Sequence, residues 1–321
     1  MPDTDTEKDS VVSSDALRFI LPITASPDRL DKTLARLLPQ HSRSRLQSWV
    51  ESGHVLVNGQ AVKVKHTVYP GDTVLVWEQQ APEDMAFEPD DVAFEIVAQS
   101  DSWLVVNKPV GLVTHPGAGN WRGTLLNGLL FRFPNLRQVP RAGVVHRLDK
   151  DTSGLLVVAR TEVAQTHFVR QLQERSMGRQ YLALVHGVLP GQGSVDEPIG
   201  RDLRVPVRMS TGPSVAPKHA VTHYQMLRQG YAGEEAVTEV ACRLETGRTH
   251  QIRVHLSSIK HPLLADTLYG GRVVAGAQRQ MLHAHVLEFD DPDTGERRRF
   301  SAEPPSDYQS VAEAIEWHTQ S

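Results

Sequence analysis

Residues 146–154 have the sequence HRLDKDTSG, which brings two carboxylates, two fixed cations and a histidine into one short run. Its closing Thr-Ser-Gly favours a turn, the apolar stretch 155–159 indicates a buried strand after it, and residues 143–145 predict a short strand before it. A tight connection between two core elements can hold a carboxylate rigidly in a cleft, where it can act as acid, base or nucleophile. The alternative for this run taken alone is a solvated, salt-bridged turn.

The net charge of −4 conceals an uneven distribution of charge along the chain. Residues 1–15, 79–101 and 286–321 are acidic, with net charges of −4, −7 and −6. The central segment 102–285 has 22 Lys and Arg against 12 Asp and Glu, and segment 27–78 has seven against five. The segment that contains the candidate carboxylate is therefore basic and can attract phosphates locally, whatever the overall charge.

Composition excludes several classes of protein and site. The 321 residues contain no apolar run of membrane-spanning length, and the polar, acidic start resembles no signal or transit peptide, so we expect a cytoplasmic protein. A single cysteine excludes a disulfide framework, and the histidines lack the spacing of zinc ligands, so we expect no metal. Neither a phosphate-binding glycine loop nor a serine-nucleophile elbow occurs, so the chemistry must be carried by carboxylate, arginine and aromatic side chains.

Residues 28–76 predict a small helical hairpin followed by strands. Leucines at helical spacing indicate a first helix that Pro39 ends, and Ser42 is a suitable N-cap for a second helix that stops at Gly53. Asn58-Gly59 is a strong hairpin-turn signal. The cations Arg43, Arg45, Lys63 and Lys65 are left outside the core of this module.

The remainder, about 91–310, alternates short apolar strands with occasional helices and predicts an α+β fold. Residues 103–106, 155–159, 181–185 and 237–244 indicate strands, and 162–174 indicates a helix with one apolar face. In 246–256, TGRTHQIRVHL, apolar residues also lie at helical spacing. We expect a helix there, with Thr249 as its N-cap and His261-Pro262 as its stop.

Together with HRLDKDTSG, three other strings resemble the RNA pseudouridine synthases of the large-subunit and tRNA type: NKPVGLVTHPG at 107–117, RQY at 179–181, and TGRTHQIRVHL. The resemblance implies that Asp149 is catalytic, that Tyr181 lies against the target base, and that Arg253 forms an ion pair with Asp149. It implies that Arg147 fills the space in the RNA that the extruded base leaves, and it implies further RNA contacts. These RNA contacts would be made by His115, Arg179 and Arg248.

The same resemblance implies a mixed, largely antiparallel sheet with peripheral helices over residues 91–310. Residues 27–78 resemble the S4 RNA-binding domain, which implies that Arg43, Arg45, Lys63 and Lys65 bind phosphates without selecting sequence. The alternative is a small α/β module with incidental surface cations. We expect an acidic flexible tail and lead-in at 1–26, a linker at 79–90 and a C-terminal tail at 311–321.

The implied reaction is the isomerisation of uridine to pseudouridine, in which the base is flipped out, detached, turned and rejoined without a cofactor. Asp149 could attack C1′ or remove the C2′ proton, and the sequence leaves both open. Within the family, PRAG at 140–143 and HPGAGN at 115–120 most resemble enzymes that act on the helix 69 loop of 23S rRNA. We therefore expect 23S rRNA or a large-subunit precursor as the partner of a monomeric enzyme that binds neither membrane nor metal.

Three alternatives stay open at this point. The first is the same chemistry on other rRNA or tRNA uridines, and the second is a non-catalytic S4-type RNA-binding protein. The third is a glycoside hydrolase that uses Asp149 with Asp151. Two strings, 259–262 and 264–266, depart from the family in that many relatives have a glycine in each, and both lie outside the expected catalytic trio.

Overall fold

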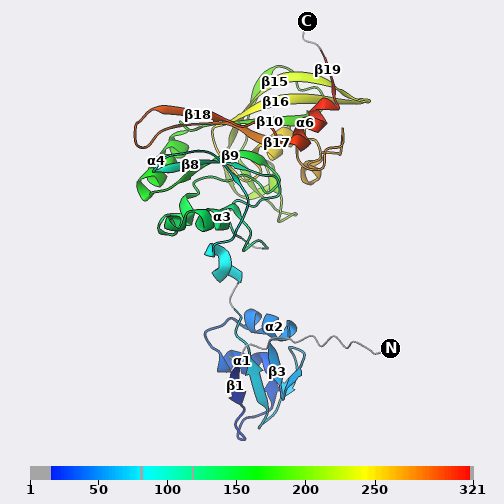
Figure 1. The fold of residues 1–321 in the computed structure, drawn as a ribbon. Coiled ribbons are helices and arrows are strands. Elements are labelled where there is room, and N and C mark those ends of the chain that lie inside the picture. The colour runs from blue at the N-terminus through cyan, green and yellow to red at the C-terminus, as the bar shows by residue number, and fades with distance from the viewer. Residues whose placement is uncertain (1–15, 80–81, 118, 319–321) are drawn as a thin grey trace, which may run out of the picture. The chain divides into compact units, whose positions relative to one another are not determined.

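The computed structural model of the protein describes residues 16–79, 82–117 and 119–318. The chain divides into two compact units, Met1–Ala81 and Pro82–Ser321, whose chain course can be followed in Figure 1. Each unit has hydrophobic core clusters of its own. The two units are described separately below.

The first unit contains two helices and two small antiparallel sheets, and its core is formed by apolar side chains from both helices and the strands. The larger sheet has the order β1-β6-β3-β4, and β2 pairs with β5. The described elements are β1 (Leu17–Ile20), β2 (Asp28–Arg29), α1 (Leu30–Leu37), α2 (Arg43–Glu51), β3 (Val55–Val57), β4 (Gln60–Ala61), β5 (Thr67–Val68) and β6 (Thr73–Val76).

Local sequence signals explain the boundaries in this unit. The side chain of Ser42 accepts a hydrogen bond from the backbone N–H of Arg45, as expected for the N-cap of α2. Asn58 and Gly59 have positive φ angles of 52° and 79° and join β3 to β4, which is the conformation that the Asn-Gly pair favours. The lead-in expected to be flexible instead contains β1, which pairs with β6 from residue 17 onward, so that part of the prediction is wrong.

The second unit contains a large sheet, a small three-stranded sheet and helices. The helices are α3 (Leu125–Arg132), α4 (Glu162–Glu174), α5 (Gln251–Ser258) and α6 (Ser306–Glu313), with 3-10 turns at Pro82–Phe87, Pro134–Gln138, Pro140–Gly143 and Thr267–Tyr269. The strands are β7 (Glu95–Gln99), β8 (Trp103–Lys108), β9 (Ser153–Ala159), β10 (Gly178–His186), β11 (Gln192–Asp196), β12 (Ile199–Asp202), β13 (Met209–Ser210), β14 (Ser214–Lys218), β15 (Val221–Ala232), β16 (Glu235–Leu244), β17 (Leu282–Asp290), β18 (Arg297–Ser301) and β19 (Glu316–Trp317).

The large sheet has the order β11-β15-β16-β10-β17-β9-β8-β7. Outside this order, β18 pairs with β17 and β19 pairs with β15. Its pairings are antiparallel except for that between β17 and β9, so the sheet is mixed and largely antiparallel as predicted. Strands β10 and β17 are central. Their pairing shifts register between Gln180 and Tyr181, a bulge of the kind that redirects side chains near functional sites.

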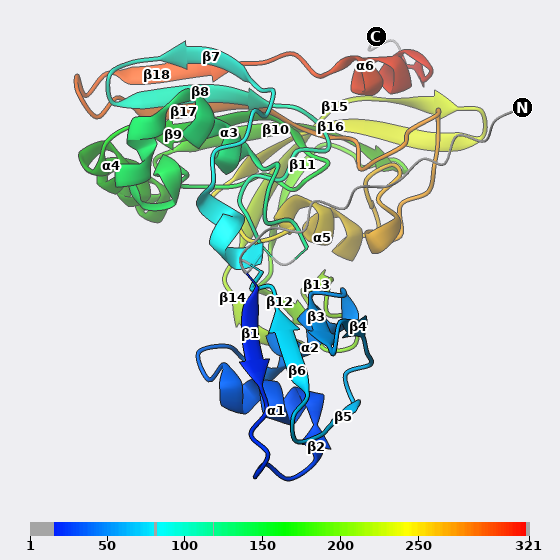
Figure 2. The ribbon, with the colours of Figure 1, turned by 60° about the horizontal axis from the view of Figure 1, so that its bottom comes forward.

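Helices cover both faces of this sheet. Neighbouring side chains of β10 point to opposite faces of the sheet. Tyr181 and Ala183 pack into the core cluster that includes α3 and α5, whereas Leu184 packs with α6 on the other face. Helix α4 packs through Phe168 against the β8, β9 and β17 side chains of a further cluster. Figure 2 shows α5 and α6 on opposite sides of β15 and β16.

Three further expectations differ from the structure. Residues 143–145 form no strand but a single bridge from Val144 to Val158, because the preceding 3-10 turn bends the chain. The expected linker belongs to the second unit from residue 82, where a 3-10 turn brings the Ala86 carbonyl to the side-chain amide of Asn127. The expected C-terminal tail is packed, because Val311 and Ile315 are buried and β19 pairs with β15.

Candidate functional site

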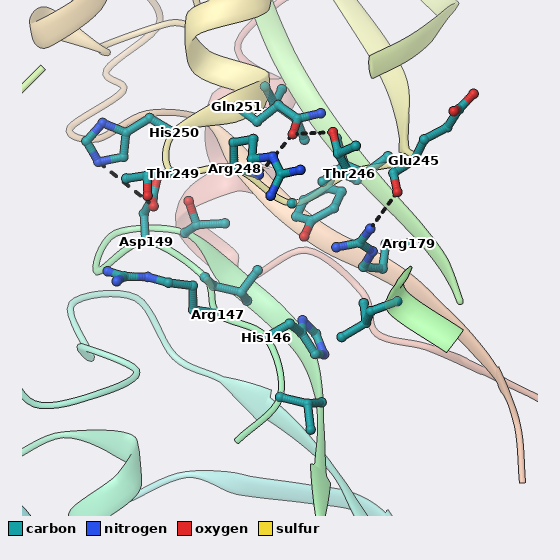
Figure 3. A pocket seen from close by; sticks show the side chains of 18 of the residues that line it. His146, Arg147, Asp149, Arg179, Glu245, Thr246, Arg248, Thr249, His250 and Gln251 are labelled. Atoms are coloured by element: carbon teal, nitrogen blue, oxygen red, sulfur yellow. Dashed lines mark hydrogen bonds and ion pairs between the residues drawn. The ribbon is translucent and has the colours of Figure 1, made fainter. Parts of the chain in front are cut away.

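A pocket of about 830 Å³ in the second unit is lined by residues from six separate parts of the chain. Most come from the segment that ends in the HRLD turn before β9, from helix α4, from the start of β10 and from the segment that leads from β16 into α5, and the other two parts contribute His115 and Leu282. Asp149, Tyr181 and Arg253, the three residues expected to be catalytic, all line it. Figure 3 shows Asp149 and His250 close together at one end of the pocket and Arg179 beside Glu245 at the other.

The Asp149 carboxylate is held by the predicted ion pair. Nη1 of Arg253 donates to Oδ2 of Asp149 at 3.0 Å, and the two side chains are 9% and 16% exposed. The opposite edge of the Arg253 guanidinium donates two hydrogen bonds to Asp266, at 2.7 and 2.9 Å. Arg253 thus lies between two carboxylates, and their charges raise the pKa of its guanidinium against the opposing effect of burial. The arginine stays charged and fixed in orientation.

Asp266 is a site residue that sequence reasoning missed. It lies in one of the two strings set aside as outside the catalytic trio, yet its side chain is 1% exposed and bound to Arg253. Both strings also contain a non-glycine residue in the left-handed region, Lys260 with φ of 72° and Ala265 with φ of 58°. This conformation favours glycine, so the departures from the family fall where the backbone itself prefers glycine.

His250 lies next to the Asp149–Arg253 ion pair in space. Its Nε2 is 3.9 Å from Oδ1 of Asp149, and its Nδ1 is 2.7 Å from the hydroxyl of Tyr269, which accepts from the backbone N–H of Met209. The Tyr269 hydroxyl therefore has its proton free to donate to Nδ1. His250 also caps α5 with φ of 56° and no side-chain cap bond, so the predicted helix is present but the N-cap is not Thr249.

Tyr181 and Arg179 extend from the same face of β10, two residues apart. Tyr181 is 6% exposed. Burial raises the pKa of its hydroxyl, the positive charge of Arg179 opposes this rise and the negative charge of Asp149 adds to it. Both charged groups therefore act on the Tyr181 hydroxyl.

The backbone of the turn that carries Asp149 is held by buried side chains. The hydroxyl of Thr114 donates to the carbonyl of Leu148, and Nζ of Lys108 donates to the carbonyl of Lys150 at 3.0 Å. One guanidinium nitrogen of Arg279 donates to the carbonyl of Asp151, also at 3.0 Å. The side chain of Asp149 can therefore face the pocket while its backbone stays fixed.

His146, the histidine of the opening run, has a structural position. Its Nε2 accepts a hydrogen bond from the backbone N–H of Val157 at 3.1 Å. Burial, together with the charge of Arg179, lowers the pKa of the imidazole to about 3. The ring is therefore neutral near pH 7 and fixes the turn to β9.

The residues expected to bind RNA fall into two groups. Arg147 and Arg248 are exposed, and with His115 and Arg179 they line the pocket. The others belong to the first unit, where Arg43 pairs with the buried Asp31 at 2.7 Å and Arg45 donates to the carbonyl of Gln79. The remaining two cations, on the β4–β5 connection, are exposed: Lys63 and Lys65.

The described part of the chain contains no group of three His, Cys, Asp or Glu side chains placed to hold a metal ion. Within residues 16–79, 82–117 and 119–318, no helix is long and apolar enough to cross a membrane. The pocket instead presents carboxylate, guanidinium, imidazole and phenol groups. Its chemistry is that of acids, bases, nucleophiles and fixed charges.

Comparison with known proteins identifies the family. Residues 102–258 match the family model for RNA pseudouridylate synthase, and residues 28–74 match that of the S4 domain. A relative from Neisseria meningitidis is 47% identical over 89% of this chain and 78% of its own, and one from Xanthomonas campestris is 45% identical over 95% and 94%. Both are named ribosomal large subunit pseudouridine synthase D. The chain belongs to the RNA pseudouridylate synthase family.

Solved structures agree with this family and with the α+β fold. Human RNA pseudouridylate synthase domain containing 1 matches with a TM-score of 0.57 and 29% identity, over 76% of this chain and 94% of its own. A second human protein of the family, domain containing 4, has the same fold at a TM-score of 0.53 and 23% identity. The resemblance found in the motifs is thus confirmed, and this chain is an RNA pseudouridine synthase, an isomerase, with an N-terminal S4 domain.

Proposed function

We propose that this synthase converts specific uridines of large-subunit rRNA to pseudouridine, with the helix 69 loop of 23S rRNA as its target. The names of its relatives support a large-subunit substrate. In this proposal Asp149 is the catalytic residue, no cofactor takes part, and the enzyme acts as a monomer in the cytoplasm. The first unit and the exposed pocket cations bind the RNA backbone.

The observation that carries this proposal is the setting of Asp149. One of its oxygens is bound to Arg253 at 3.0 Å, while the other lies 3.9 Å from Nε2 of His250. An arginine fixed by Asp266 donates a charge-assisted hydrogen bond to this carboxylate and holds its direction. The second oxygen is then directed to the ribose of a uridine whose base lies on Tyr181.

The remaining residues have distinct parts in the proposed mechanism. Extruding a uridine from structured RNA costs a few kcal/mol, and the exposed Arg147 beside Asp149 can fill the vacated space. Stacking of the flipped base on Tyr181 contributes about 1–3 kcal/mol toward that cost. Asp149 then either bonds to C1′ or removes the C2′ proton, and either route releases the base for rotation.

Mapping of pseudouridine in the rRNA of a deletion strain tests the target. We expect the helix 69 uridines to be unmodified in that strain, restored by the wild-type gene and not restored by Asp149→Asn. An intact helix 69 pattern with losses at other rRNA or tRNA sites would move the activity to those uridines. Complete modification everywhere would contradict the proposed function.

A further inference from the structure

Three arginines are buried among the described residues of the second unit, and they differ in their partners. Arg253 has Asp149 and Asp266, and Arg279 has Asp307, which it contacts at 2.6 and 3.1 Å. Arg179 is 6% exposed and forms no ion pair with any described residue. Its Nε has no hydrogen-bond partner there, and one terminal nitrogen reaches the carbonyl of Glu245 only at 3.4 Å.

A buried guanidinium without an anion is unfavourable, because desolvation of the charge is not compensated. Burial lowers the pKa of Arg179, the Tyr181 hydroxyl opposes this effect, and the charge of the nearby Arg248 adds to it. A group kept in this state suggests a charge partner that is present only during the reaction. Active sites are where such uncompensated groups are expected.

Arg179 packs against the segment that leads from β16 into α5. A Cβ on Gly247 would lie 2.6 Å from a terminal nitrogen of Arg179, so the guanidinium is in close contact with the backbone at Gly247. Arg179 lies on β10 on the same face as Tyr181, and both line the pocket that contains Asp149. A base that lies on Tyr181 is therefore also within the field of Arg179.

We propose that Arg179 is a catalytic residue that stabilises the negative charge of the detached uracil. When the N1–C1′ bond breaks, both electrons of the bond stay with the uracil, and the anion carries its charge on N1, O2 and O4. C1′ is taken up by a bond to Asp149 or by loss of the C2′ proton. After rotation, C5 bonds to C1′ while the C1′–Asp149 bond breaks or, on the other route, while C2′ regains its proton from Asp149. The C5 proton then leaves and N1 gains a proton, so atoms and charge balance.

This role holds for both routes open to Asp149, because the uracil leaves as an anion in each. A fixed cation in a water-poor site lowers the energy of such a developing charge strongly. A phosphate contact, which the RxY motif alone would permit, suits the exposed Arg147 and Arg248 better than a guanidinium that is 6% exposed. The proposal rests on the pocket being the catalytic site proposed above.

The test compares Arg179→Gln and Arg179→Lys with the wild-type enzyme under single-turnover conditions. One RNA substrate contains uridine at the target and the other 5-fluorouridine, whose fluorine stabilises the uracil anion. Conversion is measured as loss of the target nucleoside in digests. We expect Arg179→Gln to lower the rate on uridine by about 100-fold or more, with unchanged RNA affinity. On 5-fluorouridine the factor by which the rate falls should be several-fold smaller. Arg179→Lys, which keeps the charge, should retain part of the rate on uridine.

Stability gives a second readout that a structural role would not produce. Removal of an uncompensated buried charge should leave the free energy of unfolding of Arg179→Gln unchanged or higher while its rate falls. Arg170→Gln, an exposed position on α4, is the matched control and should behave as wild type. Equal losses on the two substrates, a loss confined to RNA affinity, or an unchanged rate would each overturn the proposal. Asp149→Asn tests separately whether this pocket is the catalytic site, because that variant should convert neither the uridine nor the 5-fluorouridine substrate.

Discussion

At the scale of single residues, the site is a row of charges in which one arginine joins two carboxylates. Asp149 faces the pocket, Arg253 lies behind it, and the nearly inaccessible Asp266 holds Arg253 from the far side. Charge-assisted, bidentate hydrogen bonds of this kind fix geometry as well as charge. We infer that Asp266 is a positioning residue for Asp149.

Asp266→Asn should therefore lower kcat by about 10- to 100-fold, which corresponds to the loss of one charge-assisted hydrogen-bonding partner. RNA affinity should stay near the wild-type value, because Asp266 does not line the pocket. Single-turnover rates and filter-binding constants would separate the two effects. Asp202→Asn, in the small three-stranded sheet, is the control, and an undiminished rate in Asp266→Asn would refute the positioning role.

His146 gives a prediction for the dependence of stability on pH. Burial lowers the pKa of His146 from about 6.5 to about 3 in the folded protein, so the unfolded chain binds one more proton between these values. Stability should therefore fall as the pH falls from about 6.5 toward 3, by up to about 1.4 kcal/mol per pH unit from this residue. Urea unfolding at several pH values measures this change in the free energy of unfolding.

His146→Asn supplies the comparison, because an amide oxygen can accept from Val157 without titrating. The variant should lose less stability than the wild type over that range, whereas His219→Asn, at an exposed position, should follow the wild type. Parallel curves for all three proteins would show that His146 is not the titrating group.

At the scale of elements, the turn that carries Asp149 is held by segments far away in the chain. Lys108 at the end of β8 and Arg279 before β17 bind the carbonyls of Lys150 and Asp151, and Arg279 also pairs with Asp307 of α6. The last helix is thus connected to the turn by one buried guanidinium. The C-terminal segment is part of the scaffold of the site.

Ile315 tests this reassignment of the expected tail. Because it is 4% exposed in the cluster that α6 forms with β10 and β16, Ile315→Ala should lower the free energy of unfolding by about 2–5 kcal/mol. Glu313→Ala, on the exposed side of α6, should change it by less than about 0.5 kcal/mol. Denaturant unfolding would measure both changes. Equally small effects would mean that this segment is a tail that adds nothing to the stability of the core.

Strong local patterns made several elements predictable. The apolar face of residues 162–174 matches α4 at both ends, and the apolar run 155–159 lies within β9. The strand expected at 143–145 failed because short apolar runs do not specify their partners. The segment after residue 310 is acidic and polar overall, and its buried Val311 and Ile315 were too few to indicate a core element.

The site was predictable as far as motifs named its residues. Asp149, Tyr181 and Arg253 do line one pocket, and the Arg253–Asp149 ion pair is present as predicted. The pairing of Arg253 with Asp266, and the lack of an ion-pair partner for Arg179 among the described residues, depend on tertiary packing. Local sequence patterns contain no signal for either.

At the scale of the whole molecule, the protein combines an acidic total charge with basic segments at 27–78 and 102–285. In the first unit, Arg43 and Arg45 are partly engaged within the fold, while Lys63 and Lys65 are exposed. Phosphate binding by this unit should therefore depend strongly on the two lysines. RNA affinity should reflect both units.

The double variant Lys63→Ala and Lys65→Ala should weaken rRNA binding and reduce its dependence on salt, by roughly 0.7–0.9 in the logarithmic slope for each phosphate that is no longer neutralised. Titrations at several salt concentrations measure both quantities. Lys32→Ala, which removes a cation paired with Asp28, is the control in the same unit. An unchanged slope would mean that these lysines do not bind phosphate.

The most direct test of the account is the activity of Asp149→Asn. The amide preserves the shape of the side chain but removes the charge needed to attack C1′ or accept the C2′ proton. In a single-turnover assay with 23S rRNA, we expect no detectable pseudouridine from the variant while its RNA affinity stays within a few-fold of wild type. Pseudouridine formation at a rate near that of the wild type would contradict the assignment of Asp149 as the catalytic residue.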